Sequence, residues 1–116
     1  MDRDQALTSC RALPGATEGF PFGDTAAVFK VGGKMFAIVP VGADSASISL
    51  KCEPNYASAL REQYPAVSAG YHLNKRHWNT VTLDGSVDDE LLREWVRDSY
   101  DLAVAGLTRA QRGALA

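Results

Sequence analysis

Two adjacent glycines, Gly32 and Gly33, separate the apolar runs AAVFKV and KMFAIVPV. Glycine reaches positive φ values at little cost, and the tightest hairpin turns need positive φ at both central positions. The glycine pair therefore predicts an antiparallel hairpin in the middle of the chain. Both of its strands are apolar enough to belong to a core, so this hairpin restricts the possible folds more than any other feature.

Further strands are predicted on both sides of this hairpin. The stretch TEGFPFGD, residues 17–24, is extended and turn-rich, and Pro21 favours an edge position because proline cannot donate a ladder hydrogen bond. The stretch SASISLKC, residues 45–52, alternates small polar residues with Ile48, Leu50 and Cys52, as a half-buried strand does. These neighbouring strands predict an antiparallel meander, and residues 68–83 predict a second hairpin-like stretch.

Two helices are predicted from their ends and their apolar spacing. Residues 3–13 begin with a capping box formed by Asp2 and Gln5 and stop before Pro14. Residues 54–64 begin with Pro54, which suits the first helical turn because its missing N–H costs nothing there. The second helix has an expected buried stripe of Tyr56, Ala57, Leu60 and Tyr64.

A long helix is predicted over residues 87–105. Ser86 and Asp89 match a capping box, and Gly106 can end the helix. Its expected apolar face contains Leu91, Leu92, Trp95, Val96, Ser99, Leu102 and Ala103. We expect Tyr100 to be partly buried with its hydroxyl hydrogen-bonded. Residues 107–116 are expected to form a short helix or a frayed tail.

The composition fits one small domain. The chain has 116 residues, of which 46% are hydrophobic, and this is enough for one packed core. With the order of elements, it predicts an α+β two-layer sandwich over residues 1–116, in which helices cover one face of an antiparallel sheet. No apolar run approaches the roughly 18 residues of a membrane span, and MDRDQALTSC lacks the apolar core of a signal peptide. Two cysteines are too few for a disulfide framework, so we expect a reduced, cytoplasmic protein.

Charge is distributed unevenly along the chain. The net charge is −2, but residues 24–83 hold six Lys/Arg against four Asp/Glu, whereas residues 84–101 hold seven Asp/Glu against two Lys/Arg. Cations on exposed hairpin loops can contact phosphates, and Trp78 beside them can stack on a base. The candidate nucleic-acid contacts are Lys30, Lys34, Lys51, Lys75, Arg76 and His77. Core packing of Trp78 and a solvated turn at Lys75 and Arg76 are the competing structural interpretations.

No motif indicates catalysis or a bound metal or cofactor. The soft ligands Cys10, Cys52, His72 and His77 lack the paired spacing of a zinc site. The in-phase position of Cys52 with Leu50 favours a buried structural thiol. An enzyme built around His77 with Tyr100 or Cys52 requires these side chains to converge in a concave pocket. We therefore expect a non-enzymatic protein without a cofactor.

The blocks GFPFGD, VFKVGGKMFAIV, ISLKCEP, YHLNKRHWNTVTLDGSVDDELL and SYDLAV resemble the MmcQ/YjbR family of small bacterial proteins. The most specific pieces are the Asn74-Lys75-x-His77-Trp78 motif and the run from Ser99 to Leu102. The resemblance implies a compact α+β fold similar to the frataxin/CyaY-like arrangement, described as double-wing. It also implies a DNA-binding role and brings no catalytic residues. Frataxin-like iron binding needs an acidic first helix, and Asp2 and Asp4 are too few for one.

Two functions therefore remain open. The first is a monomeric, non-enzymatic DNA-binding protein that contacts phosphates electrostatically. The second is a protein-interaction or small-ligand module that does not bind nucleic acid, for which the acidic last helix suits a basic partner. Neither function involves a membrane.

Overall fold

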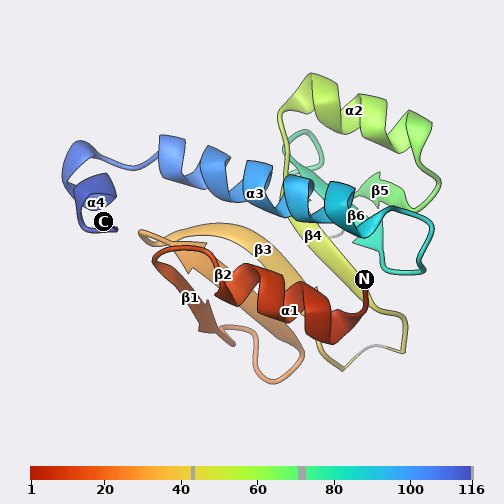
Figure 1. Cartoon of the computed structure of the whole chain (residues 1–116), viewed down its shortest axis with the longest axis horizontal. Coiled ribbons are helices and arrows are strands. Elements are labelled where there is room, and N and C mark those ends of the chain that lie inside the picture. The colour runs from red at the N-terminus through yellow and green to blue at the C-terminus, as the bar shows by residue number, and fades with distance from the viewer. Residues whose placement is uncertain (43, 71–72, 116) are drawn as a thin grey trace.

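The computed structural model describes residues 1–42, 44–70 and 73–115. Figure 1 shows their arrangement, in which the helices and strands are α1 (Arg3–Arg11), β1 (Ala16–Gly19), β2 (Ala26–Val31), β3 (Lys34–Pro40), β4 (Ser47–Lys51), α2 (Pro54–Gln63), β5 (Val67–Ala69), β6 (Trp78–Thr82), α3 (Asp89–Ala105) and α4 (Arg109–Gly113).

The strands form one six-stranded sheet in the order β1-β2-β3-β4-β6-β5, and every neighbouring pair is antiparallel. The first four strands follow one another as the predicted meander. Strand β6 then pairs with β4, and β5 forms the far edge, so the antiparallel pair β5 and β6 confirms the second predicted hairpin. The predicted α+β fold class is confirmed.

The central hairpin turns at Gly32 and Gly33, as predicted. Their φ angles are +56° and +83°, in the left-handed region that favours glycine, and Val31 pairs with Lys34 across the turn. The register shifts after Phe29, so that Phe36 is an extra residue in β3. This bulge allows Phe36 and its neighbour Ala37 both to be fully buried.

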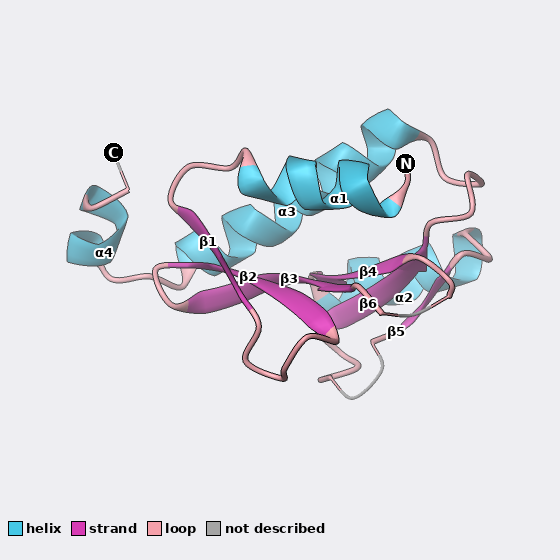
Figure 2. Ribbon diagram, turned by 90° about the horizontal axis from the view of Figure 1, so that it is seen from below, coloured by secondary structure: helices cyan, strands magenta, loops and turns pink. Residues whose placement is uncertain are grey.

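Helices α1 and α3 lie on the same side of the sheet (Figure 2). The core between the layers includes Phe29, Phe36, Ile48, Val81, Trp95 and Val96. Helix α2 packs beside α3. The rings of Tyr64, which follows α2, and Trp95 on α3 are in edge-to-face contact, with their centres 5.2 Å apart. The face of the sheet turned away from α1 and α3, called the outer face below, carries the alternate side chains of each strand.

Three expectations about individual positions need correction. Strand β1 ends at Gly19, so Pro21 lies beyond it in the following loop, although β1 is an edge strand as expected. Tyr56 and Leu102 were expected on buried helix faces, but their exposed fractions are 44% and 42%. Tyr56 on α2 and Leu102 on α3 line one hollow and are therefore open to solvent.

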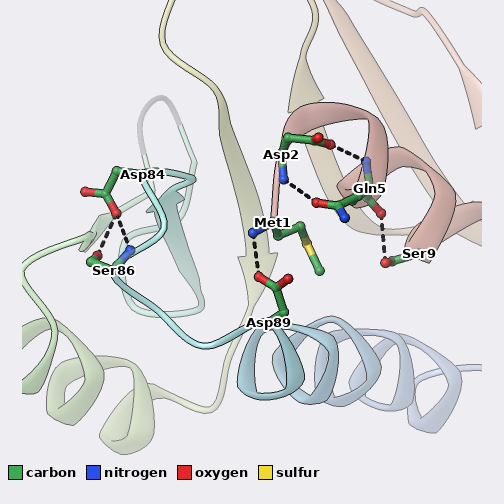
Figure 3. A network of polar contacts seen from close by, with 7 residues as sticks. All are labelled: Met1, Asp2, Gln5, Ser9, Asp84, Ser86 and Asp89. Atoms are coloured by element: carbon green, nitrogen blue, oxygen red, sulfur yellow. Dashed lines mark hydrogen bonds and ion pairs between the residues drawn. The ribbon is translucent and has the colours of Figure 1, made fainter.

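The start of α3 also differs from the expected capping box. Figure 3 shows that Ser86 instead donates from its amide and its hydroxyl to Asp84, at 3.0 and 2.6 Å. The helix begins at Asp89 after Asp88, which makes no side-chain capping bond. The carboxylate of Asp89 binds the N-terminal ammonium of Met1 instead, at 2.5 Å. The capping box of Asp2 and Gln5 on α1 forms as predicted.

Tyr100 is more deeply buried than expected, with 5% of its surface exposed. Its ring packs edge to face against Phe36 at 5.5 Å, and its hydroxyl donates to the carbonyl of Pro14. The tail forms the short helix α4, as expected. None of the helices in the described residues is long and apolar enough to cross a membrane.

Candidate nucleic-acid interface

The neighbouring ends of four strands, β2, β3, β4 and β6, place the predicted basic residues at one end of the sheet. Strand β2 ends where β3 begins, and β4 ends where β6 begins, because each of these pairs is antiparallel. The register brings Lys30 opposite Met35 and Lys51 opposite Trp78. All six candidate residues therefore lie at one end of the sheet, which is called the basic end: Lys30, Lys34, Lys51, Lys75, Arg76 and His77.

Lys51 has the most constrained position of the six. Its Nζ lies 5.9 Å from the centre of the Trp78 ring, within cation–π range. Its amide donates to the hydroxyl of Ser99 on α3 at 2.8 Å. Burial lowers the pKa of the Lys51 ammonium below its usual value, and the nearby positive charge of Lys34 lowers it further. A charge on Lys34 can affect the pKa of Lys51 because both lysines lie at the basic end.

The loop that carries Lys75, Arg76 and His77 is held by hydrogen bonds at both ends. The amide of Arg76 donates to the side-chain oxygen of Asn74 at 3.0 Å, and the amide of His77 donates to the Asn74 carbonyl at 3.1 Å. The Cys52 amide donates to the carbonyl of His77 at 2.7 Å. All three basic side chains are exposed, so a fixed backbone presents them to solvent.

Arg61 on α2 connects this loop to the helix layer. Its Nε donates to the side-chain oxygen of Asn79 at 2.7 Å, and its Nη2 donates to the carbonyl of Lys75. Asn79 is 3% exposed and donates to the carbonyl of Ala57 at 3.3 Å. Because one guanidinium joins α2, β6 and the loop, Arg61 positions the cations without being one of the predicted contacts.

Cys52 follows β4 and lines two adjoining hollows of about 480 and 390 Å³. The larger contains Lys51, His77 and Trp78, whereas the smaller contains Tyr56, Asp98 and Leu102. Burial raises the pKa of the Asp98 carboxyl, and the charges of Glu94 and Asp101 raise it further. These acids belong to α3, so negative charge borders the basic end on its helix side.

The hypothesis of an enzyme around His77 separates into two cases. Tyr100 lies in the core against Phe36, whereas His77 is exposed, so these two side chains do not form a site together. Cys52 and His77 do line one hollow. However, burial and the charges of Glu53 and Asp98 raise the pKa of the Cys52 thiol, whereas a nucleophilic cysteine needs a lowered pKa.

The metal candidates are distributed over different parts of the fold. Cys10 is buried in α1, and Cys52 lies at the end of β4. His72 lies outside the described residues. Within residues 1–42, 44–70 and 73–115, no three His, Cys, Asp or Glu side chains are grouped closely enough to hold a metal ion.

Sequence reasoning missed the exposed aromatic residues near this interface. Phe20 and Phe22 follow β1 and are 48% and 63% exposed. A signal was present, because Pro21 between the two aromatic residues, with Gly19 and Gly23 on either side, favours a turn over a buried strand. Arg61 was also missed, and no local pattern distinguishes it from an ordinary solvated helix residue.

The sequence comparisons agree with one another along most of the chain. A model of the YjbR family matches residues 11–102. The uncharacterized protein YjbR of Escherichia coli K12 is 38% identical over 112 residues, which cover 97% of this chain and 95% of that protein. The uncharacterized protein YbdF of Escherichia coli O157:H7 is 36% identical over 97 residues, with coverage of 84% and 80%.

Solved structures show the same architecture. The crystal structure of DR2400 from Deinococcus radiodurans, which contains a DUF419 domain, superposes with a TM-score of 0.89 at 44% identity. The superposition covers 97% of this chain and 86% of that one. A Pseudomonas syringae protein has a TM-score of 0.77 at 26% identity, with coverage of 89% and 99%. The fold is therefore shared by relatives with quite different sequences.

Proposed function

The chain belongs to the YjbR family, and from this premise we propose that it binds DNA through the basic end of its sheet without catalysing a reaction. The observation that carries the proposal is that five separately predicted lysine and arginine side chains, with His77 beside them, lie at the neighbouring ends of four strands. Lysine and arginine at such a site bind phosphates without reading the base sequence. We therefore expect electrostatic binding that weakens steeply as salt increases.

Two features of the site support this proposal. Lys34 at the start of β3 and Lys75 and Arg76 in the loop before β6 are all exposed, so their charges can follow a phosphate backbone that passes the sheet end. The acids Asp98 and Asp101 lie on α3, so the phosphates approach from the side away from that helix. This arrangement offers a positive surface on a protein whose net charge is −2.

The test measures fluorescence anisotropy of a labelled mixed-sequence duplex at about 50 mM salt, where phosphate contacts are strong. We expect the double variant Lys34→Gln/Lys75→Gln to weaken binding about tenfold, because two phosphate contacts are lost. The matched control is Arg93→Gln, which removes an exposed cation from α3, outside the basic end. Absence of binding by the unmodified protein, or an equal effect of both variants, contradicts the proposal.

The hollow between α2 and α3 favours a second candidate function, binding of a basic protein segment. Tyr56 and Leu102 supply exposed apolar surface there, and Glu53, Asp98 and Asp101 supply negative charge. A pull-down from nuclease-treated extract tests it. A partner that is retained after nuclease treatment and lost in Leu102→Lys, which replaces apolar surface with a repelling charge, supports this candidate, whereas a partner lost with the nucleic acid contradicts it.

A further inference from the structure

The outer face of the sheet carries a hollow that the contact at the basic end does not use. Ile48 and Val81 pair with each other and point into the core, so the adjacent pair Ser49 and Thr80 points to the outer face. The hydroxyls of Ser49 and Thr80 are hydrogen-bonded at 2.8 Å. The hollow has a volume of about 450 Å³ and is lined by Phe22, Ile38, Pro40, Ser47, Ser49, Leu73 and Thr80.

Exposed aromatic rings border this face. Phe22 lines the hollow and is 63% exposed, and Phe20 is 48% exposed. The amide of Gly23 donates to the carbonyl of Phe20 at 3.2 Å, which closes a turn with Pro21 at its second position. The hydroxyl of Thr25 donates to the carbonyl of Phe22 at 3.3 Å. Both rings are therefore presented to solvent by a turn whose backbone is already fixed.

Positive charge accompanies the aromatic surface. Phe20 also lines a second hollow, of about 380 Å³, together with Val28 and with Lys30, which belongs to the basic end. The acid in this hollow is Glu18, whose carboxylate is bound by Arg11 at 2.7 Å. This hydrogen bond lowers the pKa of Glu18 and offsets its charge. The 450 Å³ hollow is lined by apolar and hydroxyl groups alone, so its lining adds no negative charge.

We propose that the outer face binds single-stranded nucleic acid, with unpaired bases against Phe20 and Phe22 and phosphates at Lys30 and the rest of the basic end. Exposed aromatic rings beside cations bind single strands because every base has a flat face that can stack. In a duplex these base faces are already stacked on one another. The inference rests on the proposed function for its phosphate contacts and adds the class of nucleic acid.

The test compares a labelled single-stranded oligonucleotide with the duplex of the same sequence, by anisotropy at one salt concentration. The variant is Phe22→Ala, whose exposed position makes unfolding an unexpected outcome, and circular dichroism checks the fold. The control is Ser58→Ala, which changes an exposed position on α2 outside every hollow described above. We expect the unmodified protein to prefer the single strand, and Phe22→Ala to weaken single-strand binding about tenfold with a smaller effect on the duplex.

The possible failures are distinguishable. Duplex binding that depends on Lys34 and Lys75, without any single-strand preference or any effect of Phe22→Ala, overturns this inference and leaves the proposed function intact. Single-strand binding that depends on Phe22 but not on Lys34 and Lys75 supports the base contacts at the outer face, and contradicts both the proposed function and the phosphate contacts that the inference takes from it. A dimer that dissociates in Phe22→Ala, without nucleic-acid binding, assigns the face to a second copy of the chain and overturns both.

Discussion

Ser99 joins the helix layer to two strands through one hydroxyl. The residue is completely buried, and its Oγ accepts from the amide of Lys51 and donates to the carbonyl of Phe36. A buried hydroxyl costs free energy unless it is hydrogen-bonded, and this hydroxyl acts both as a donor and as an acceptor. Ser99 thereby fixes the end of β4 from which Lys51 projects.

Replacement of Ser99 by alanine is expected to destabilise the fold. The variant leaves the Lys51 amide and the Phe36 carbonyl without this partner, at a cost of about 1–3 kcal/mol. Urea unfolding measures the change. The control is Ser58→Ala, an exposed position on α2, where we expect a change within about 0.5 kcal/mol. Equal effects of the two substitutions contradict the assigned role.

Cys10 is expected to make the fold less stable at alkaline pH. The thiol is fully buried, and burial, with the charge of Glu18, raises its pKa to about 12. Above the unfolded thiol pKa of about 8.5, the unfolded chain loses this proton and the folded chain keeps it, so deprotonation favours unfolding. This loss of stability approaches about 1.4 kcal/mol per pH unit between about pH 9 and pH 11.

The measurement compares urea unfolding of the unmodified protein and of Cys10→Ala at several pH values. The alanine variant is less stable at pH 7 because it leaves a cavity. We expect this difference to shrink as the pH rises from 9 to 11, since the variant lacks the titrating thiol. A difference that stays constant over that range contradicts the account of Cys10.

At the scale of elements, strand ends and the turns between strands carry the candidate interface. The basic end combines the β2–β3 turn, the end of β4 and the loop before β6. Two of these pieces are fixed by strand pairing, and the third is held by Arg61 on α2. Helix α2 therefore serves the interface as a support for the loop that carries Lys75.

Loss of the Arg61 side chain is expected to release this loop. In Arg61→Ala the carbonyl of Lys75 and the side chain of Asn79 lose their shared donor, so amides 74–77 exchange faster with solvent. Duplex affinity falls as well, because mobile cations lose more entropy on binding. Hydrogen exchange and anisotropy measure the two effects. Exchange at 74–77 that matches the unmodified protein contradicts the positioning role.

The sequence predicted the elements well where local chemistry determines them. The Gly32–Gly33 turn, the Asp2 capping box and the alternation of Ile48 and Leu50 each identify their element without distant contacts. The Ser86 capping box was wrong because Asp84 offers the same hydroxyl a closer partner, and Asp89 binds the N-terminus from 88 positions away. A contact of that separation has no local pattern.

The candidate site was predictable as a set of residues but not as a place. Each basic residue was recognised from its own position in a loop or strand. Their common location at one end of the sheet depends on β6 pairing with β4 as well as with β5, and no local pattern predicts that pairing. Exposure of Tyr56 and Leu102 likewise depends on the spacing between α2 and α3. Helical periodicity gives the direction of a side chain but not whether another element covers it.

At the scale of the whole molecule, an excess of acids on α3 is separated from the basic end of the sheet. The four lysines and Arg76 lie at the basic end and the other seven arginines lie on the helices, whereas residues 84–101, which include most of α3, hold seven acids against two bases. Such a separation orients a protein in the field of a polyanion even when its net charge is negative. In the proposed complex with DNA, the sheet and not the helix layer therefore faces the phosphates.

The salt dependence of duplex binding tests this account most directly. With three to five of the basic-end cations on phosphates, log K plotted against log salt has a slope between about −3 and −5. Lys75→Gln is expected to make this slope shallower by about 1, since one phosphate contact is lost, and Arg93→Gln is expected to leave it unchanged. A slope near zero for the unmodified protein, or one that Lys75→Gln does not change, contradicts binding of DNA at the basic end.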